Sequence, residues 1–337
     1  MNPKRNLLIV AVLGTVAAVA GFVYYHHIVQ VKAAKLERGG PGPAPYFPPG
    51  AVWTQDVSHA PLDPQSGTMI QWLAENGGWG TNNRFQIDFS FRVLQADAKT
   101  PFVPFHKGPG FYEGNADDIS TFPLPAAATL GPCDGDCQLL VVDRSRGKLY
   151  ETFQTTAAAD SVTAQFVAVW NLNRVYPPSG RGDQCTSADS AGFPIAPLLF
   201  NADELAAGHI DHAIRFILPN PRIRAHVYVH PATHAGAPRG PVEAPPIGAR
   251  FRLKASYDVS QLMPEAQVVA RALQKYGMFL SDGGNIALTA QSDQDTKTKY
   301  SDLDFNSHSL FGFKVTDFEV VDMGTPIHLT DNCVLNK

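Results

Sequence analysis

The stretch Arg84-Phe-Gln-Ile-Asp-Phe-Ser-Phe-Arg-Val93 alternates polar and apolar side chains along its whole length. A repeat of two sends successive side chains to opposite faces of an extended chain. This stretch is the clearest strand pattern in the sequence. It predicts a β-strand with one face in a core and one polar face.

A β-hairpin is predicted further along the chain. Residues 139–143 and 148–153 have strand composition, and Arg144-Ser-Arg-Gly147 between them forms a turn. Residues 165–172 add a third strand, which gives an antiparallel meander.

The other patterns are short strands and a few helices. Asp63-Pro64 begins a helix that ends at Gly77-Gly78, residues 264–275 form an amphipathic helix, and residues 201–207 form a helical turn. Further strands are predicted at 209–218, 248–255, 278–280, 285–290 and 313–321. The sequence shows neither a repeat nor the strand–helix rhythm of a parallel sheet. It therefore predicts a mainly β fold, an antiparallel β-sandwich or jelly-roll with a few short helices, preceded by an N-terminal hydrophobic segment.

Composition excludes several classes of protein. Of 337 residues, 44% are hydrophobic and 17% are charged, which excludes a disordered chain, and 27 prolines and 28 glycines exclude a coiled coil. Residues 1–50 carry a net charge of +4, so the remainder carries −8. Such an acidic domain has no electrostatic footprint for nucleic acid, which we exclude as a partner.

The N-terminus predicts export. Residues 7–25 carry no charge, close to the ~20 residues of a membrane helix. A signal peptide cleaved after Ala18-Val-Ala20 is the alternative, but Phe22-Val-Tyr-Tyr25 prolongs the apolar segment and favours an anchor. We predict a signal anchor or signal peptide over 1–30, a Pro/Gly-rich linker over 31–50 and one β-rich extracytoplasmic domain over 51–337. The domain would be periplasmic or at the cell surface, membrane-anchored through the N-terminal segment or secreted.

The cysteines favour an oxidising compartment. An even set of four, Cys133, Cys137, Cys185 and Cys333, permits three disulfide pairings. We favour Cys133 with Cys137 across the Asp134-Gly-Asp136 turn, and Cys185 with Cys333. Free buried thiols and a zinc site are the alternatives, although Cys-x3-Cys lacks the two close pairs typical of zinc. No metal or other cofactor is predicted.

No established catalytic motif marks the reaction. The sequence contains no GxxxxGK[ST], no GxGxxG after a strand, no GxSxG and no HExxH. The long loop over 175–194 and the segment after it are the most suggestive region. The catalytic candidates are Asp189, His212 and Asp282. Each has a structural alternative: His212 as a core residue, and the two aspartates as turn residues.

Substrate-binding candidates lie on the predicted strands. Arg250, Arg252 and Lys254 share one strand face that would hold an anionic sugar or form salt bridges within the domain. His226, His230 and His234 recur every four residues, but Pro231 favours strand and turn over a helical metal site. The full set predicted to bind substrate is Arg84, Glu151, Trp170, Arg250 and Lys254.

Several strings of the sequence carry a resemblance. They are Thr186-Ser-Ala-Asp-Ser-Ala-Gly192, His212-Ala-Ile-Arg-Phe216, Gly248-Ala-Arg-Phe-Arg-Leu-Lys-Ala-Ser-Tyr-Asp258 and Ala272-Leu-Gln-Lys-Tyr-Gly277. These strings resemble those of a widespread group of secreted bacterial proteins with no assigned function. The resemblance covers most of residues 50–320 and implies export and a single domain, but no mechanism.

The leading functional hypothesis is an exported carbohydrate-active enzyme, a glycoside hydrolase or polysaccharide lyase with carboxylate and histidine acid–base chemistry. Its partner would be a polysaccharide or cell-envelope glycan. The alternative is a non-catalytic envelope module that binds a glycan or a protein. A hydrolase of esters or peptides is a third hypothesis.

Overall fold

The computed structural model describes residues 45–128 and 134–336. The predicted segment over 1–30, most of the linker and Cys133 lie outside the described residues. Among the helices described, none is long and apolar enough to cross a membrane.

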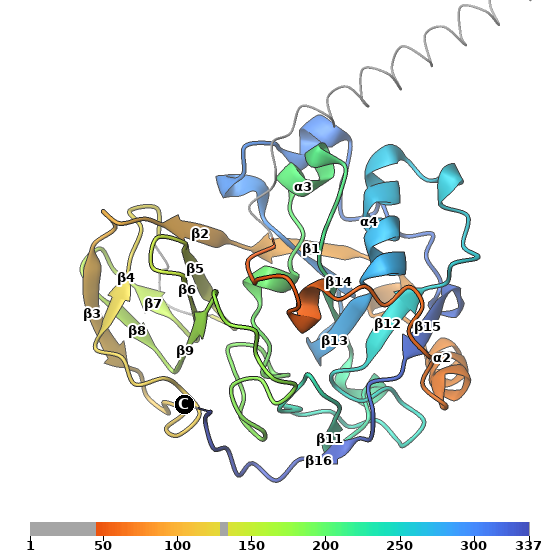
Figure 1. The fold of residues 1–337 in the computed structure, drawn as a ribbon, viewed down its shortest axis with the longest axis horizontal. Coiled ribbons are helices and arrows are strands. Elements are labelled where there is room, and N and C mark those ends of the chain that lie inside the picture. Colours follow the sequence, from red (N-terminus) through yellow and green to blue (C-terminus); the bar gives the residue numbers. More distant parts are fainter. Residues whose placement is uncertain (1–44, 129–133, 337) are drawn as a thin grey trace, which may run out of the picture.

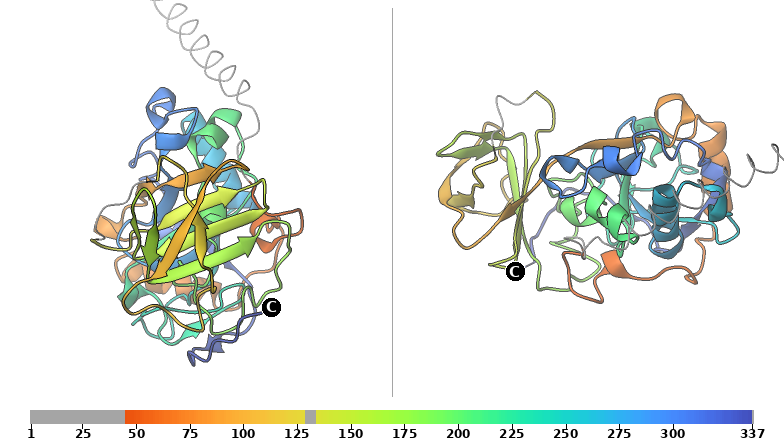
Figure 2. Two further views of the ribbon diagram at one scale, coloured as in Figure 1. Left: turned by 90° about the vertical axis from the view of Figure 1, so that its left-hand side faces the viewer. Right: turned by 90° about the horizontal axis from the view of Figure 1, so that it is seen from above.

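The chain forms two lobes (Figures 1 and 2). The larger lobe contains a six-stranded sheet in the order β1 (Ile87–Phe91), β14 (Leu288–Gln291), β10 (Ile214–Leu218), β13 (Met278–Gly283), β12 (Arg250–Leu253) and β15 (Phe318–Val321). Its helices are α2 (Ser66–Glu75), α3 (Ala202–Ala207) and α4 (Pro264–Lys275). A two-stranded sheet pairs β11 (Val227–Tyr228) with β16 (Ile327–His328).

The smaller lobe contains two four-stranded sheets. One has the order β2 (Val93–Ala96), β5 (Leu139–Asp143), β6 (Lys148–Phe153) and β9 (Phe166–Asn171). The other has the order β4 (Thr121–Pro123), β3 (Phe102–Lys107), β8 (Val162–Ala164) and β7 (Thr156–Ala157). Apolar side chains of both sheets form one core between them, which is the arrangement of a β-sandwich.

The prediction of a mainly β protein with a few short helices is confirmed. The sheets are mixed, however, because β1 pairs with β14, β10 with β13, β2 with β5 and β3 with β8 in parallel. The prediction of purely antiparallel sheets is wrong for these pairs. Parallel neighbours need long connections, and β10 reaches β13 only through β11, β12 and α4.

The strand predicted over 84–93 divides into β1 and β2, which belong to different lobes. Arg92, between the two strands, forms an ion pair with Asp295 (Nε–Oδ2 2.5 Å). Phe85 and Ile87 are buried in the larger core as the alternation predicts. The pattern identified the buried face, but the strand is interrupted at Arg92, where the chain passes from one lobe to the other.

The meander is confirmed as β5, β6 and β9, which pair antiparallel. One face of this sheet contributes Leu139, Val141 and Val167 to the core of the smaller lobe. The opposite face contributes Leu140 and Trp170 to the core of the larger lobe. The sheet is therefore buried on both faces. The core of the larger lobe continues into the smaller lobe through the side chains of this second face.

The predicted disulfide between Cys185 and Cys333 is present, with a Cα–Cα distance of 4.5 Å. Cys137 is also disulfide-bonded, while Cys133 lies outside the described residues. The C-terminal segment, residues 322–336, runs from β16 past the larger lobe toward the smaller one (Figure 1). There Asn336 donates its backbone N–H to the Arg181 carbonyl (2.6 Å).

Candidate functional site between the lobes

A pocket of about 270 Å³ lies where the two lobes meet. The smaller lobe supplies an aromatic wall of Tyr112, Phe153 and Phe166. The larger lobe supplies polar residues of the loop around position 188, together with His234 and Asp282. The other lining residues are Asp136, Gln138, Thr186, Ser187, Ala188, Ser190, Gly236 and Gly283.

Two of the predicted catalytic residues, Asp189 and Asp282, are brought together by Arg215. The Arg215 Nε lies 2.7 Å from Asp189 Oδ2, and its Nη2 lies 3.4 Å from Asp282 Oδ2. Arg215 is on β10 and Asp282 on β13, and these strands are parallel neighbours. The sequence segments that carry the three side chains are distant, so only the sheet pairing assembles the cluster.

The loop that carries Asp189 is held in a tight conformation. The Asp189 carboxylate accepts the backbone N–H of Ala191 (3.1 Å), and the Ser187 hydroxyl accepts the backbone N–H of Asp189 (2.9 Å). Gly192 has a φ of +78°, and a Cβ there would lie 2.1 Å from the Thr233 hydroxyl oxygen. The loop therefore needs glycine at this position both for its backbone angle and for its close packing.

The two carboxyl groups differ in exposure and therefore in what they can contact. Asp189 is fully buried, whereas the Asp282 side chain is 28% exposed and lines the pocket. Burial raises the pKa of Asp189, against the lowering effect of Arg215. Burial, and then the nearby charge of Asp189, raise the pKa of Asp282 to about 6. Of these two aspartates, only Asp282 combines a raised pKa with access to a ligand in the pocket.

Asp136 is a functional candidate that the sequence reasoning missed. It was assigned only to a turn between two cysteines, but it lines the pocket and is exposed. Its charge contributes to the raised pKa of Asp282. The Asp-Gly-Asp string next to Cys137 was the only signal available, and it is equally typical of a turn.

His212 lies in a different environment from the two aspartates. Its Nε2 is 3.2 Å from Glu204 Oε1, and its Nδ1 is 2.7 Å from the Ala213 carbonyl oxygen. Burial lowers the pKa of His212, but the Glu204 carboxylate, the Ala213 carbonyl and the charge of Asp211 together raise it more, so the net shift is upward. His212 is fully buried and does not line the pocket, so the structure gives it the core role that the sequence left open.

Glu151 and Trp170 are both buried and joined to each other. The Trp170 indole N–H donates to Glu151 Oε2 (3.0 Å), and the backbone N–H groups of Ile195 and Ala196 donate to Oε1 (2.8 and 2.9 Å). Burial raises the pKa of Glu151 to about 8 against these three hydrogen bonds. Neither side chain lines the pocket between the lobes, and the pair fastens the loop of the larger lobe to β6 and β9.

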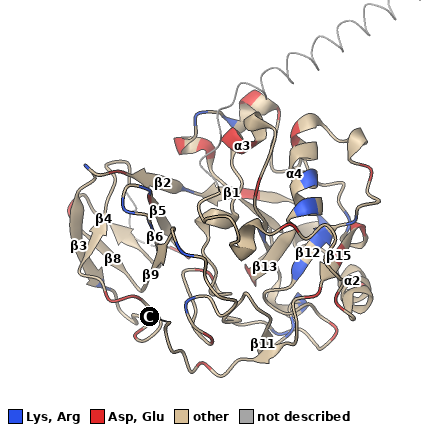
Figure 3. Cartoon of the chain, in the orientation of Figure 1, with Lys and Arg blue, Asp and Glu red and all other residues tan. Residues whose placement is uncertain are grey.

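The predicted basic residues do not face the pocket either. Arg250 is buried and donates to the carbonyls of Tyr276 and Gln55 (2.8 Å each). Lys254 donates to the Thr316 carbonyl (2.8 Å). Figure 3 shows β12, blue where its residues are basic, on the side of the larger lobe remote from the smaller one. Arg250 does not lie on an exposed strand face, because all the residues of β12 are buried.

Arg84, His230 and His234 each contact a different partner. The Arg84 guanidinium lies 5.1 Å from the centroid of the Phe311 ring. His230 Nε2 lies 2.8 Å from Asp183, and His234 Nε2 lies 3.5 Å from Asp331. Within residues 45–128 and 134–336, no group of three or more His, Cys, Asp or Glu side chains is placed to hold a metal ion.

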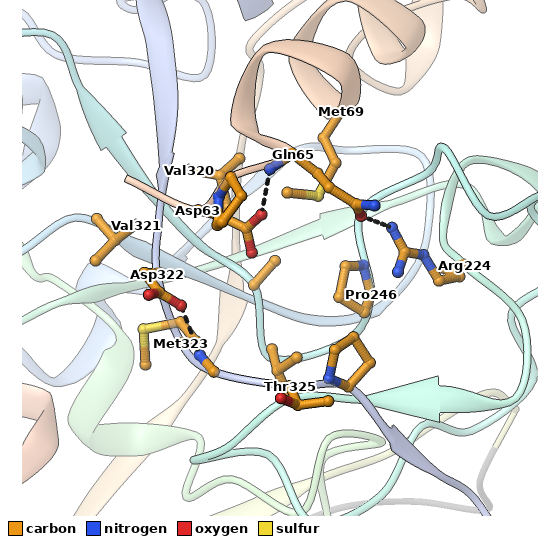
Figure 4. Close-up of a pocket in the computed structure, with 15 residues that line it drawn as sticks. Asp63, Gln65, Met69, Arg224, Pro246, Val320, Val321, Asp322, Met323 and Thr325 are labelled. Carbon is orange, nitrogen blue, oxygen red and sulfur yellow. Dashed lines mark hydrogen bonds between the residues drawn. The ribbon is translucent and has the colours of Figure 1, made fainter. Parts of the chain in front are cut away.

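A second pocket, of about 500 Å³, lies beside α2 and β15 (Figure 4). Its polar groups mostly stabilise local turns: Asp63 accepts the backbone N–H of Gln65 (2.7 Å), and Asp322 accepts that of Gly324 (2.9 Å). Arg224 donates to the Gln65 side chain (3.1 Å). None of the residues predicted for catalysis or binding lines this pocket.

Comparison of the chain with protein-family models, curated proteins and solved structures finds no significant match. The chemistry of the pocket between the lobes is therefore argued from its own residues.

Proposed function

We propose that this protein is an exported carbohydrate-active enzyme that cleaves a glycan in the pocket between the lobes. The observation that carries the proposal is the Asp282 carboxyl group, which is partly exposed in the pocket and has a pKa of about 6. A carboxylic acid with such a pKa holds its proton at mildly acidic pH, as the general acid of a glycosidase must. Cleavage of a glycosidic bond also needs a second carboxylate, and Asp136 lines the same pocket.

Asp189 and Arg215 act as positioning residues in this proposal. They are almost fully buried, with exposures of 0% and 3%, and therefore do not touch a ligand in the pocket. Asp189 keeps the pKa of Asp282 high through its charge, and Arg215 holds both carboxylates in place. The buried pair thus affects both the pKa and the position of the Asp282 carboxyl group, which would donate the proton.

The two walls of the pocket suit a sugar. Sugar rings have an apolar face and a polar rim, and specific ligand sites combine aromatic surface with a few well-placed polar groups. Tyr112 and Phe153 supply the aromatic surface, with Phe166 packed behind Tyr112, and Ser190 supplies a hydroxyl group. The Cys185–Cys333 disulfide supports export, because such bonds persist in oxidising compartments.

The test is to screen the purified full-length protein against a panel of polysaccharides, with detection of both new reducing ends and unsaturated products. Asp282→Asn and Asp136→Asn should each lower turnover on an accepted glycan at least a hundredfold, as expected for loss of an acid–base group. Asp134→Asn is the matched control, because Asp134 lies on the same loop as Asp136 but does not line the pocket. Undiminished turnover by Asp282→Asn would show the assignment to be wrong, and binding without turnover would identify a glycan-binding module instead.

A further inference from the structure

We infer that the pocket between the lobes accepts a glycan without acidic groups, and that the cleavage is a hydrolysis rather than the elimination reaction of a uronate lyase. The inference rests on the proposed function and specifies its substrate class. It is carried by the charges that line the pocket and by the positions of the nearest cations.

The charged groups that line the pocket are acidic. Asp136 and Asp282 line it, and the described lining includes no Lys or Arg. The neighbouring residues 129–133 lie outside the described part of the chain, but their sequence, Thr-Leu-Gly-Pro-Cys, contains no charged side chain. A uronate or sulfated sugar in this pocket would meet the like charge of Asp136 and, above a pH of about 6, that of Asp282 as well.

Two guanidinium groups behind the pocket walls, those of Arg215 and Arg181, are already paired. Arg215 is 3% exposed and is engaged by Asp189 and Asp282. Arg181, which lies 5.7 Å from the Phe166 ring centroid, is 5% exposed and is engaged by Asp117 (3.0 Å) and the Thr186 carbonyl (3.0 Å). Neither guanidinium is available to neutralise an acidic substrate without breaking a buried ion pair, which is costly.

The reaction chemistry leads to the same choice. Elimination from a uronate requires a base for the C5 proton and a cation that stabilises the developing negative charge on the carboxylate. The described pocket lining supplies carboxylates and no Lys or Arg, and the Nε2 of its histidine, His234, already faces the Asp331 carboxylate at 3.5 Å. Hydrolysis needs only what is present: the glycosidic C–O bond breaks, and the Asp282 proton passes to the departing oxygen. Water adds its hydroxyl to the anomeric carbon, its remaining proton passes to Asp136, and solvent returns a proton to Asp282.

The size of the pocket limits how much of the glycan it holds. Its volume of about 270 Å³ is just below the usual range for ligand pockets, about 300–1,000 Å³. We therefore expect one or two sugar units to enter, neutral or with free amino groups, while the rest of the glycan stays outside.

The experiment uses matched pairs of tetrasaccharides, gluco-, galacto- and manno-configured in both α and β linkage, with C6 as either hydroxymethyl or carboxylate. Affinity and cleavage are measured with the full-length protein at low and high salt. In every pair that is recognised, we expect the carboxylate form to bind at least tenfold more weakly, with a smaller difference at high salt. Asp136→Asn should reduce this discrimination, and the matched control Asp134→Asn should leave it unchanged.

Two results would overturn the inference in distinguishable ways. Equal or tighter binding of the carboxylate forms, or release of unsaturated products, would refute the substrate class but leave a carbohydrate-active enzyme in place. If no oligosaccharide of the panel, acidic or neutral, were bound or cleaved, the proposed function itself would fall and the inference with it.

Discussion

Replacing Asp282 with Asn should stabilise the folded protein at pH 7.5, although it removes the proposed proton donor. Burial and the charge of Asp189 raise the pKa of Asp282 from 3.8 to about 6. The ionised carboxylate is therefore less favourable in the folded state than in the unfolded chain. The folded state retains its proton between pH 4 and 6, where the unfolded chain releases it, so stability falls as pH rises through this range.

The size of the effect follows from the pKa shift. Each pKa unit corresponds to about 1.4 kcal/mol, so an ionised Asp282 costs about 3 kcal/mol at pH 7.5. An asparagine removes this cost and keeps the acceptor for the Gly283 N–H, which Asp282 Oδ1 accepts at 2.7 Å. It loses the 3.4 Å contact with Arg215, which is longer than the 2.7 Å contact of Arg215 with Asp189. We therefore expect a net gain of about 1–3 kcal/mol.

Chemical denaturation of wild type and Asp282→Asn at pH 7.5 and pH 4 measures this gain. The difference should shrink to less than about 1 kcal/mol at pH 4, where both forms carry a proton or an amide. Asp134→Asn, on an exposed loop, should change little at either pH. A variant that is less stable than wild type at pH 7.5 would refute the reasoning, because the contact with Arg215 would then outweigh the cost of burying the charge.

Three further predictions concern buried groups. Asp189→Asn should destabilise the protein by about 3–5 kcal/mol in denaturant titrations, because it removes the main partner of the buried Arg215 charge; a loss below 1 kcal/mol would count against the pairing. Replacing Cys185 and Cys333 together by Ser should cost up to about 5 kcal/mol, from the 148-residue separation of the two cysteines, as measured under non-reducing conditions; unchanged stability would mean that the bond does not constrain the unfolded chain. His212 has a raised pKa, so its stabilising effect is present below about pH 6.5 and is lost as pH rises through its folded pKa. The melting temperature of His212→Gln should therefore vary less than that of wild type between pH 6 and 9, and equal pH dependence of the two proteins would contradict this.

Local patterns identified the elements whose partners are close in sequence. The hairpin of β5 and β6, the adjoining β9 and the helix α4 lie where composition and periodicity predicted them. The loop from 175 to 194 contains the predicted Asp189 and also Cys185, one of the two cysteines of the predicted disulfide. In each case the signal is an alternation, a cap or a cysteine count, which depends on neighbouring residues or on composition alone.

The sequence by itself therefore determined a mainly β chain, favoured the Cys185–Cys333 bond and singled out the two carboxyl groups, Asp189 and Asp282, that meet at Arg215. Tertiary structure alone decided which side chains share that site. Arg215 joins Asp189 to Asp282 because β10 and β13 are parallel neighbours, and Asp136 reaches the pocket because the smaller lobe packs against the larger. The environment of a side chain depends on contacts between distant segments, and neither periodicity nor charge counting records those contacts.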